Sequence, residues 1–277
     1  MKIRYILIIS VLLLFGFGSL SKLFESDKIA VLEIKGVIEN PKKIINSLAD
    51  IKNNEIYKGL IVRIDSPGGT VGSSQEIYSF IKEIQKKIPV VASIVDIGAS
   101  GGYLIACSAE HIIANPGSIT GSIGVISQYY DASKLLSDLG LNIEVLKSGE
   151  FKDSTSPTRP LNENEKKMLK SVLEDIHNQF KNLVKKERNL TADQLDFVSK
   201  GQIFTGFQAK QYKLVDDLGG ILLAKKYIEN KVNLIDLKFE YFPKKKERLL
   251  DQVLPENINF KNVSSIIFKK IFFLYTP

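Results

Sequence analysis

The 277-residue sequence contains one cysteine (Cys107), two histidines (His111 and His177) and no tryptophan. A single cysteine excludes an intrachain disulfide and any zinc site built from several cysteines. Two histidines leave little material for a metal centre or a catalytic triad, so we expect neither a metal nor a cofactor. With 44% hydrophobic and 25% charged residues, the composition is that of a globular protein and not of a disordered or collagen-like one.

One uncharged stretch, residues 5–21 (YILIISVLLLFGFGSLS), stands near the N-terminus. As a helix its 17 residues would span about 25 Å, the lower limit for crossing a bilayer. Lys2 and Arg4 precede it and should stay in the cytoplasm, which would put the rest of the chain on the outer side. A cleaved signal peptide, cut near residues 19–21 (SLS), is the main alternative, and a buried core helix is a third.

The excess of positive over negative charge comes from the two ends of the sequence. The net charge is +7, whereas residues 29–224 carry 23 basic and 23 acidic side chains. A nucleic-acid-binding domain would more often present a basic face on its folded part, so we expect no nucleic-acid partner. Basic ends on a neutral body are better suited to contact with an anionic membrane surface.

Short β-branched runs alternate with helical patterns through the body of the chain. We expect strands at residues 29–34, 60–65, 89–95, 111–115, 123–130 and 142–146, and helices at residues 41–52, 73–87, 101–109 and 131–139. A longer helix should start at Leu161, where Asn162 can cap it and Glu165 stands three residues further on. In that helix, apolar residues follow helical spacing from Leu169 to Val184. The alternation predicts an α/β fold with a largely parallel sheet.

Two glycine-rich turns follow predicted strands and precede predicted helices. Residues 65–70 (DSPGGT) either expose backbone N–H groups to a ligand or form an ordinary turn. Residues 98–103 (GASGGY) place Ser100 where its hydroxyl could attack a substrate and the next N–H could bind an oxyanion. The alternative is a serine that only caps the helix. This turn also fits G-x-S-x-G, the nucleophile elbow of α/β-hydrolases, which requires a histidine base.

Neither histidine suits that role. His177 falls inside the longest predicted helix, and His111 follows Ser100 closely at the start of a predicted strand, so we expect both to be structural. A catalytic serine can instead use a lysine that burial keeps neutral. Lys152, in residues 148–153 (SGEFKD), is the candidate, although a solvated surface lysine is the simpler interpretation of the local sequence alone.

Together these segments resemble the signal peptide peptidases of the SppA type, membrane-bound serine peptidases with a Ser-Lys dyad. The matching motifs, in the family's order and spacing, are residues 65–69 (DSPGG), 99–103 (ASGGY), 115–125 (NPGSITGSIGV), 148–153 (SGEFKD) and 201–206 (GQIFTG). The resemblance covers about residues 28–225. The fold that it implies is the spiral ββα architecture of Clp protease and crotonase, present here in a single copy.

The resemblance also implies a role for each residue of the site. Ser100 would be the nucleophile and Lys152 the general base. The N–H groups of Gly69 and Gly101 would form the oxyanion hole. The hydroxyl of Ser122 would hold the lysine amine in place.

The proposed base has to lose its proton near neutral pH. A free lysine has a pKa of about 10.4, so a neutral amine near pH 7 requires a desolvated site. We therefore expect the Lys152 amine to be buried beside Ser100 and Ser122. Asp153, its neighbour in sequence, should point away, because a nearby carboxylate would keep the amine charged.

The implied activity is that of a serine endopeptidase that degrades cleaved signal peptides or other membrane-associated peptides. The resemblance further implies a homo-oligomer, in which Lys152 could reach Ser100 of a neighbouring subunit. The expected location is the plasma (inner) membrane, with a single pass, a cytoplasmic N-terminus and the catalytic domain on the outer or periplasmic side. Two alternatives remain open: an esterase of the α/β-hydrolase type using Ser100 and His177, and a membrane scaffold or a protease dedicated to one membrane protein on the same fold.

We divide the chain into an anchor or signal (residues 1–27), a Clp/crotonase-like peptidase domain (28–230) and a basic apolar tail (231–277). Within the tail, apolar residues with interspersed lysines form one helical stripe over residues 260–275. This stripe could lie on a membrane surface, pack on a neighbouring subunit, or mimic a substrate in the chain's own active site.

Overall fold

The computed structural model describes residues 26–244 and 272–274. Its main sheet is formed by β1 (Lys28–Lys35), β2 (Tyr57–Ser66), β4 (Val90–Ala99), β5 (His111–Ala114), β6 (Ile119–Gly121), β7 (Ile203–Thr205), β8 (Asp217–Leu218) and β9 (Lys238–Phe242). The strand order is β7-β6-β4-β2-β1-β9, and β5 joins β4 to β8 beside this path. All of these pairs are parallel except β6 with β7, so the predicted α/β fold with a largely parallel sheet is confirmed.

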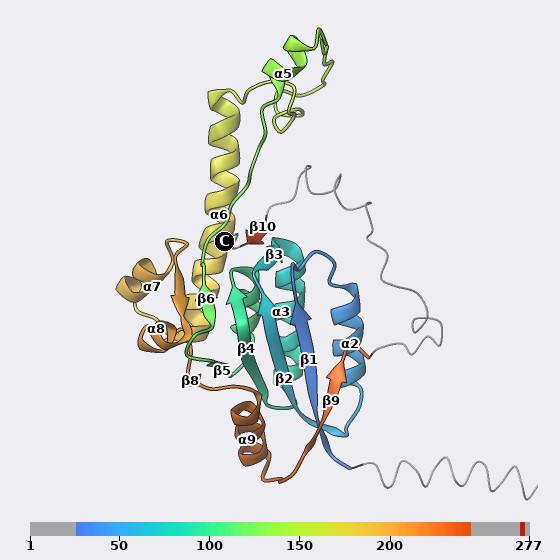
Figure 1. The fold of residues 1–277 in the computed structure, drawn as a ribbon, viewed down its shortest axis with the longest axis vertical. Helices are drawn as coiled ribbons and strands as arrows, with labels where there is room; N and C mark the ends of the chain where they lie inside the picture. The colour runs from blue at the N-terminus through green and yellow to red at the C-terminus, as the bar shows by residue number, and fades with distance from the viewer. Residues whose placement is uncertain (1–25, 245–271, 275–277) are drawn as a thin grey trace, which may run out of the picture.

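Helices cover both faces of the sheet (Figure 1). One face carries α2 (Lys42–Lys52), α3 (Val71–Gln85) and α4 (Gly101–Ala106), and the other carries α9 (Ile221–Val232). The alternation of side chains along β1 shows how the sequence builds both layers. Ala30 and Leu32 are fully buried in the larger core, under α2 and α3, while Ile29 and Val31 are fully buried in the smaller core, under α9. A strand buried on both faces reads as a continuous apolar run, which is why this strand was predictable.

The longest helix, α6 (Glu163–Arg188), is capped by Asn162 as predicted and begins two residues after the predicted start at Leu161. The side chain of Asn162 accepts a hydrogen bond from the N–H of Glu165, and the Glu165 side chain accepts one from the N–H of Asn162. This reciprocal capping box satisfies two backbone donors that the helix itself cannot pair. The C-terminal half of α6 packs on the body, where Phe180 and Val184 are buried.

The N-terminal half of α6 extends away from the sheet and carries an outer lobe, residues 131–162, which includes α5 (Ser133–Asp138) (Figure 1). The strands predicted at residues 123–130 and 142–146 are wrong, because neither segment forms a strand. Alternating apolar residues suggested burial in a sheet. In the single chain Ile123 is buried in the core without joining a strand, whereas the apolar side chains of residues 142–146 are exposed, Leu146 to 92%. Along the predicted apolar stripe of α6, Val172 is likewise exposed.

The folded body continues past residue 230, where we expected the tail to begin. Helix α9 crosses that position, and β9 then pairs in parallel with β1, from Lys28 opposite Lys238 to Leu32 opposite Phe242. Helices α7 (Ala192–Val198) and α8 (Gly206–Gln211) lie at the other edge of the sheet, near β7 (Figure 1).

A second, two-stranded sheet joins distant parts of the chain. β3 (Gly68–Thr70) pairs antiparallel with β10 (Phe272–Leu274), next to the ends of β2 and β4 (Figure 1). Of the expected tail segment 260–275, these three residues are described, and they form a strand instead of part of a helix.

Among residues 26–244 and 272–274, no helix is both long enough and apolar enough to cross a bilayer. The membrane segment predicted at residues 5–21 lies outside the described residues.

Candidate active site

Ser100 occupies the sharp turn between β4 and α4. Its backbone has φ +52° and ψ −117°, a conformation that residues with a Cβ rarely adopt. The neighbouring structure holds it there, because the Ser100 N–H donates to the carbonyl oxygen of Gly121 (2.8 Å) and its carbonyl accepts from the N–H of Leu104 (2.9 Å). A serine on a strained strand-to-helix turn is the arrangement of a nucleophile elbow.

The hydroxyl of Ser100 is buried without a hydrogen-bond partner. The residue is 1% exposed, and within the described part of the chain its Oγ is the one buried side-chain oxygen or nitrogen that lacks a partner. Leaving a buried polar group unpaired costs about 1–3 kcal/mol, and such groups call for an explanation. The hydroxyl is therefore available to a substrate or to a base supplied from outside these residues.

β3, which α4 contacts, has two backbone edges, and β10 pairs along one of them. The other edge is occupied: the N–H of Ile38 donates to the carbonyl oxygen of Gly68, and the N–H of Thr70 donates to the carbonyl oxygen of Ile38, both at 2.8 Å. Because alternate residues of a strand point their N–H and C=O to opposite edges, those of Gly69 face away from Ile38. A Cβ on Gly69 would lie 2.0 Å from the carbonyl oxygen of Ile38, so only glycine fits this position.

Ser66 orients this strand, a role that its place in the motif alone did not reveal. Its buried hydroxyl donates to the carbonyl oxygen of Gly36 (2.6 Å) and accepts from the N–H of Gly68 (3.1 Å). Gly68 has φ +109°, which favours glycine. The turn that leads into Gly69 is thus fixed by one serine and two glycines.

The chain's own C-terminal segment lies along the edge of β3 that faces away from Ile38. Phe272 pairs with Thr70, Phe273 with Gly69 and Leu274 with Gly68, in antiparallel register. α4, which begins directly after Ser100, contacts both β3 and β10. This backbone pairing corresponds to the third alternative for the tail, a segment that occupies the site as an extended peptide would.

Gly101 and Ser122 lie close to Ser100 through the fold. Gly101 is the first residue of α4, so its N–H has no partner within the helix. Ala99 pairs with Gly121 where β4 meets β6, and Ser122 follows directly, 8% exposed and with φ +51°. The structure therefore gathers Ser100, Gly101 and Ser122 around one junction, with β3 beside it.

Lys152 is not part of that group within one chain. It lies in the outer lobe, its side chain is exposed, and it makes no hydrogen bond to the Oγ of Ser100. The expectation that its amine is buried beside Ser100 and Ser122 is therefore not met inside the single chain. Asp153 is directed elsewhere, as expected, because its carboxylate pairs with Lys147 (2.6 Å) and Arg159 (2.8 Å).

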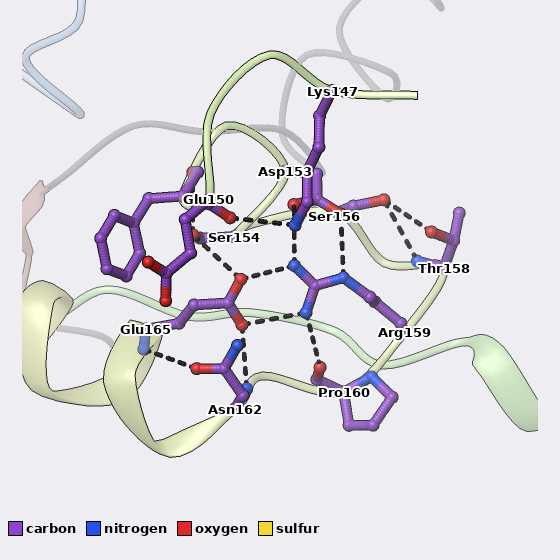
Figure 2. Close-up of polar contacts among 11 residues, drawn as sticks. Lys147, Glu150, Asp153, Ser154, Ser156, Thr158, Arg159, Pro160, Asn162 and Glu165 are labelled. Carbon is purple, nitrogen blue, oxygen red and sulfur yellow. Dashed lines mark hydrogen bonds and ion pairs between the residues drawn. The ribbon is translucent and has the colours of Figure 1, made fainter. Parts of the chain in front are cut away.

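Arg159 and Glu165 complete a polar cluster around the Lys152 loop (Figure 2), and sequence reasoning did not find their pairing. Hydrogen bonds from Arg159 and then Lys147 hold the pKa of Asp153 well below its ordinary value. Hydrogen bonds from Arg159 and from the Asn162 N–H lower the pKa of Glu165 to about 2. Glu165 was recognised as a helix-capping residue, but nothing in its spacing from Arg159 showed that the two side chains meet.

Both histidines are engaged away from Ser100. Nε2 of His177 lies 3.2 Å from the carbonyl oxygen of Ile123, and Nε2 of His111 lies 3.0 Å from the Asp217 carboxylate. The His111 ring also stacks on Tyr227, with centroids 4.3 Å apart. The structural roles expected for both histidines fit these contacts, and the esterase alternative has no histidine in contact with the nucleophile.

Comparison with known proteins gives the family. Residues 82–234 match the model of peptidase family S49, and residues 18–118 match that of Clp protease. A protein of Synechocystis sp., whose name marks it as a predicted protease, is 44% identical over 194 residues, which cover 69% of this chain and 70% of that protein. The chloroplastic serine protease SPPA of Arabidopsis thaliana is 29% identical over 212 residues, 74% of this chain and 31% of that protein.

A Methanocaldococcus jannaschii relative, also named as a predicted protease, is 33% identical over 72% of this chain and 65% of its own length. The chain thus covers less than two thirds of the Arabidopsis and Methanocaldococcus proteins. The family match itself extends over more than half of the sequence and includes the nucleophile turn and the outer lobe. The chain belongs to peptidase family S49 and is a serine peptidase of the SppA type with a Clp protease-like α/β fold.

Proposed function

We propose that this serine peptidase cleaves peptides with a dyad of Ser100 and Lys152 supplied by neighbouring subunits of a homo-oligomer. One observation carries the proposal: Ser100 Oγ is buried without a partner, while Lys152 of the same chain is exposed in the outer lobe. Ser100 needs a base, and Lys152 needs burial to become neutral. Docking the lobe of one copy over the Ser100 turn of the next supplies both at once.

The surface of the outer lobe supports such docking. Its exposed large apolar side chains are Leu135, Leu139, Leu141, Ile143, Val145, Leu146 and Phe151. Clustered apolar residues on the surface of a soluble domain mark interaction sites. A second copy of this chain is the occupant that would also bring Lys152 to a nucleophile.

The chemistry follows from the groups at the junction. Oγ of Ser100 attacks the peptide carbonyl carbon while the neutral amine of Lys152 accepts the hydroxyl proton. The N–H groups of Gly69 and Gly101 bind the developing oxyanion, an interaction worth about 3–4 kcal/mol per donor. The protonated lysine then gives its proton to the leaving amine, and water, activated by the same lysine, hydrolyses the acyl-enzyme.

Ser122 is the orienting group in this scheme. It directly follows β6, close to Ser100. Its hydroxyl would accept a hydrogen bond from the incoming Lys152 amine. Such a contact fixes the position of the amine without a carboxylate that would keep it charged.

We further propose that the substrates are membrane-associated peptides such as cleaved signal peptides. An extended peptide can add to the same edge of β3 as β10 does, through backbone contacts that tolerate many side chains. An Enterococcus faecium relative, 32% identical, carries signal peptide peptidase SppA in its name. Residues 5–21 would anchor the enzyme in the plasma membrane, with the catalytic domain on the outer side.

The shared dyad can be tested by mixing two inactive variants. Ser100→Ala and Lys152→Ala should each abolish hydrolysis of a fluorogenic peptide. Oligomers co-assembled from equal amounts of both should regain roughly a quarter of wild-type activity, because in a ring roughly that share of interfaces pairs an intact serine with an intact lysine.

His177→Ala is the control and should stay active. A mixture that remains inactive, although it co-assembles, would place the dyad within one chain. Activity of Lys152→Ala or Lys152→Arg alone would remove this lysine from the role of base.

A further inference from the structure

Arg159 sits between two carboxylates in the outer lobe (Figure 2). Its Nε and Nη2 donate to the two oxygens of Asp153 (2.9 and 2.8 Å), and Nη1 and Nη2 donate to the two oxygens of Glu165 (2.9 and 2.5 Å). Nη1 also donates to the carbonyl oxygen of Pro160 (3.1 Å). All five guanidinium N–H groups are therefore used, which a lysine could not reproduce.

Glu165 connects this cluster to the first turn of α6. Its side chain has no exposed surface, being covered by the lobe. Besides Arg159 it accepts hydrogen bonds from the N–H of Asn162 (2.9 Å) and the hydroxyl of Ser154 (3.2 Å). Arg159 thus joins Asp153 to a carboxylate that the helix cap already holds in place.

The loop that carries Lys152 is closed by the same cluster. Nζ of Lys147 donates to Oδ1 of Asp153 (2.6 Å) and to the carbonyl oxygen of Glu150 (2.9 Å), and the N–H of Lys152 donates to the carbonyl oxygen of Gly149 (3.2 Å). The charged groups nearest Lys152 in sequence are Lys147, Glu150 and Asp153. Through Asp153, the loop is fixed at the residue next to the proposed base.

From this geometry we infer that Arg159 is a positioning residue for the general base. It fixes the Lys152 loop on the start of α6 and keeps the Asp153 carboxylate occupied, so that the amine reaches Ser100 of the next subunit without Asp153 as a counter-ion. The inference rests on the proposed function. Its physical basis is that an opposite charge within about 4–6 Å favours the protonated amine, and a protonated lysine is no base.

The test is the pH dependence of kcat/KM on a fluorogenic peptide, measured with the full-length oligomer. In Arg159→Gln the carboxylate of Asp153 loses its two hydrogen bonds from Arg159, keeps the one from Lys147, and can then also pair with Lys152. We expect the acid limb of the profile to move upward by about 1 pH unit or more. The double variant Arg159→Gln/Asp153→Asn should return the limb to the wild-type pH, whether or not the maximal rate recovers.

Arg188→Gln is the matched control, because it breaks a similar bidentate pair at the opposite end of α6. Arg188 donates to the two oxygens of Asp216 at 2.6 and 3.0 Å. Its loss should lower stability without moving the acid limb. A purely structural role for Arg159 would make the two arginine variants behave alike.

An Arg159→Gln profile that overlays the wild type, while Lys152→Ala is inactive, would overturn the inference and leave the dyad intact. Activity in Lys152→Ala would instead refute the proposed function itself. Should Arg159→Gln fail to assemble, Arg159→Lys provides the measurement. One ammonium cannot bridge both carboxylates, so we expect a smaller shift in the same direction, and no shift would again overturn the inference.

Discussion

The N–H of Ser100 donates a 2.8 Å hydrogen bond to the carbonyl oxygen of Gly121. This bond ties the nucleophile turn to β6, the strand that leads directly into Ser122. It also keeps Ser100 at φ +52°, where its Cβ is disfavoured. The sheet thus holds the Ser100 backbone in its strained conformation, and the strain can be measured.

Ser100→Gly should stabilise the protein while abolishing activity. Glycine adopts this positive φ without a steric penalty, so we expect a gain of about 1 kcal/mol, or roughly 2–4 °C in Tm. Ser100→Ala is the control, since it also removes the hydroxyl but retains the Cβ. Equal Tm values for the two variants would show that the backbone of this turn is not strained.

Gly69→Ala should be severely damaging. Its Cβ would lie 2.0 Å from a backbone oxygen of Ile38, so β3 would have to move away from its neighbour. We expect a fall in Tm and loss of at least about 100-fold in kcat, the scale of losing one oxyanion donor.

Gly72→Ala is the matched substitution three residues further on. An added Cβ meets no atom within 4 Å, and Gly72 lies inside α3, so we expect unchanged activity and a gain of up to about 1 kcal/mol in stability. If Gly69→Ala behaved in the same way, the position of β3 would not matter to catalysis.

Removing residues 272–277 should lower the KM for peptide substrates several-fold with little change in kcat. β10 pairs with the edge of β3 along which we propose that substrates lie, so the segment competes with them. A synthetic peptide of residues 268–277 should inhibit the truncated enzyme competitively. Unchanged KM together with loss of the oligomer would instead favour packing on a neighbouring subunit, the alternative use of the tail.

The first turn of α6 should lose protection in acid. Hydrogen bonds from Arg159 lower the pKa of Glu165 to about 2. The Arg159–Glu165 ion pair therefore stabilises the fold fully at pH values above the ordinary glutamate pKa of about 4.3. The stabilisation is lost progressively as the pH falls from there toward about 2.

Hydrogen exchange of the α6 amides, corrected for intrinsic rates, measures this loss. The protection of these amides in the wild type should approach that in Glu165→Gln as the pH falls through this window. If the difference in amide protection between the two proteins stayed constant from pH 5 to pH 2, the Arg159–Glu165 ion pair would not be the source of the stabilisation.

The parts of the fold that were predictable are those encoded locally. β1 lies within one residue of its expected bounds because it is buried on both faces, and α6 starts at a capping box that four residues define. The Ser100 turn was predictable for the same reason, as glycines and serine lie together in sequence.

The outer lobe was not predictable, because the sequence pattern of an apolar run is the same whether its side chains are buried in a sheet or exposed on the surface of the single chain. This explains the wrong strand at residues 142–146. The separation of Lys152 from Ser100 and the pairing of Arg159 with Glu165 depend on where the chain folds back, which residue spacing does not specify. Likewise, β10 pairs with residues about 200 positions earlier, beyond any local pattern.

Helix α6 connects the body of the protein to the outer lobe (Figure 1). The Arg188 ion pair with Asp216 fixes its base to the body, and the capping box with Arg159 fixes the lobe to its tip. Its 26 residues give a length of about 39 Å, so a tilt of about 5° at the base swings the tip by about 3 Å. Such a swing equals the length of one hydrogen bond. If the lobe docks on a neighbouring subunit as we propose, a tilt of this size would be enough to bring Lys152 into or out of reach of Ser100.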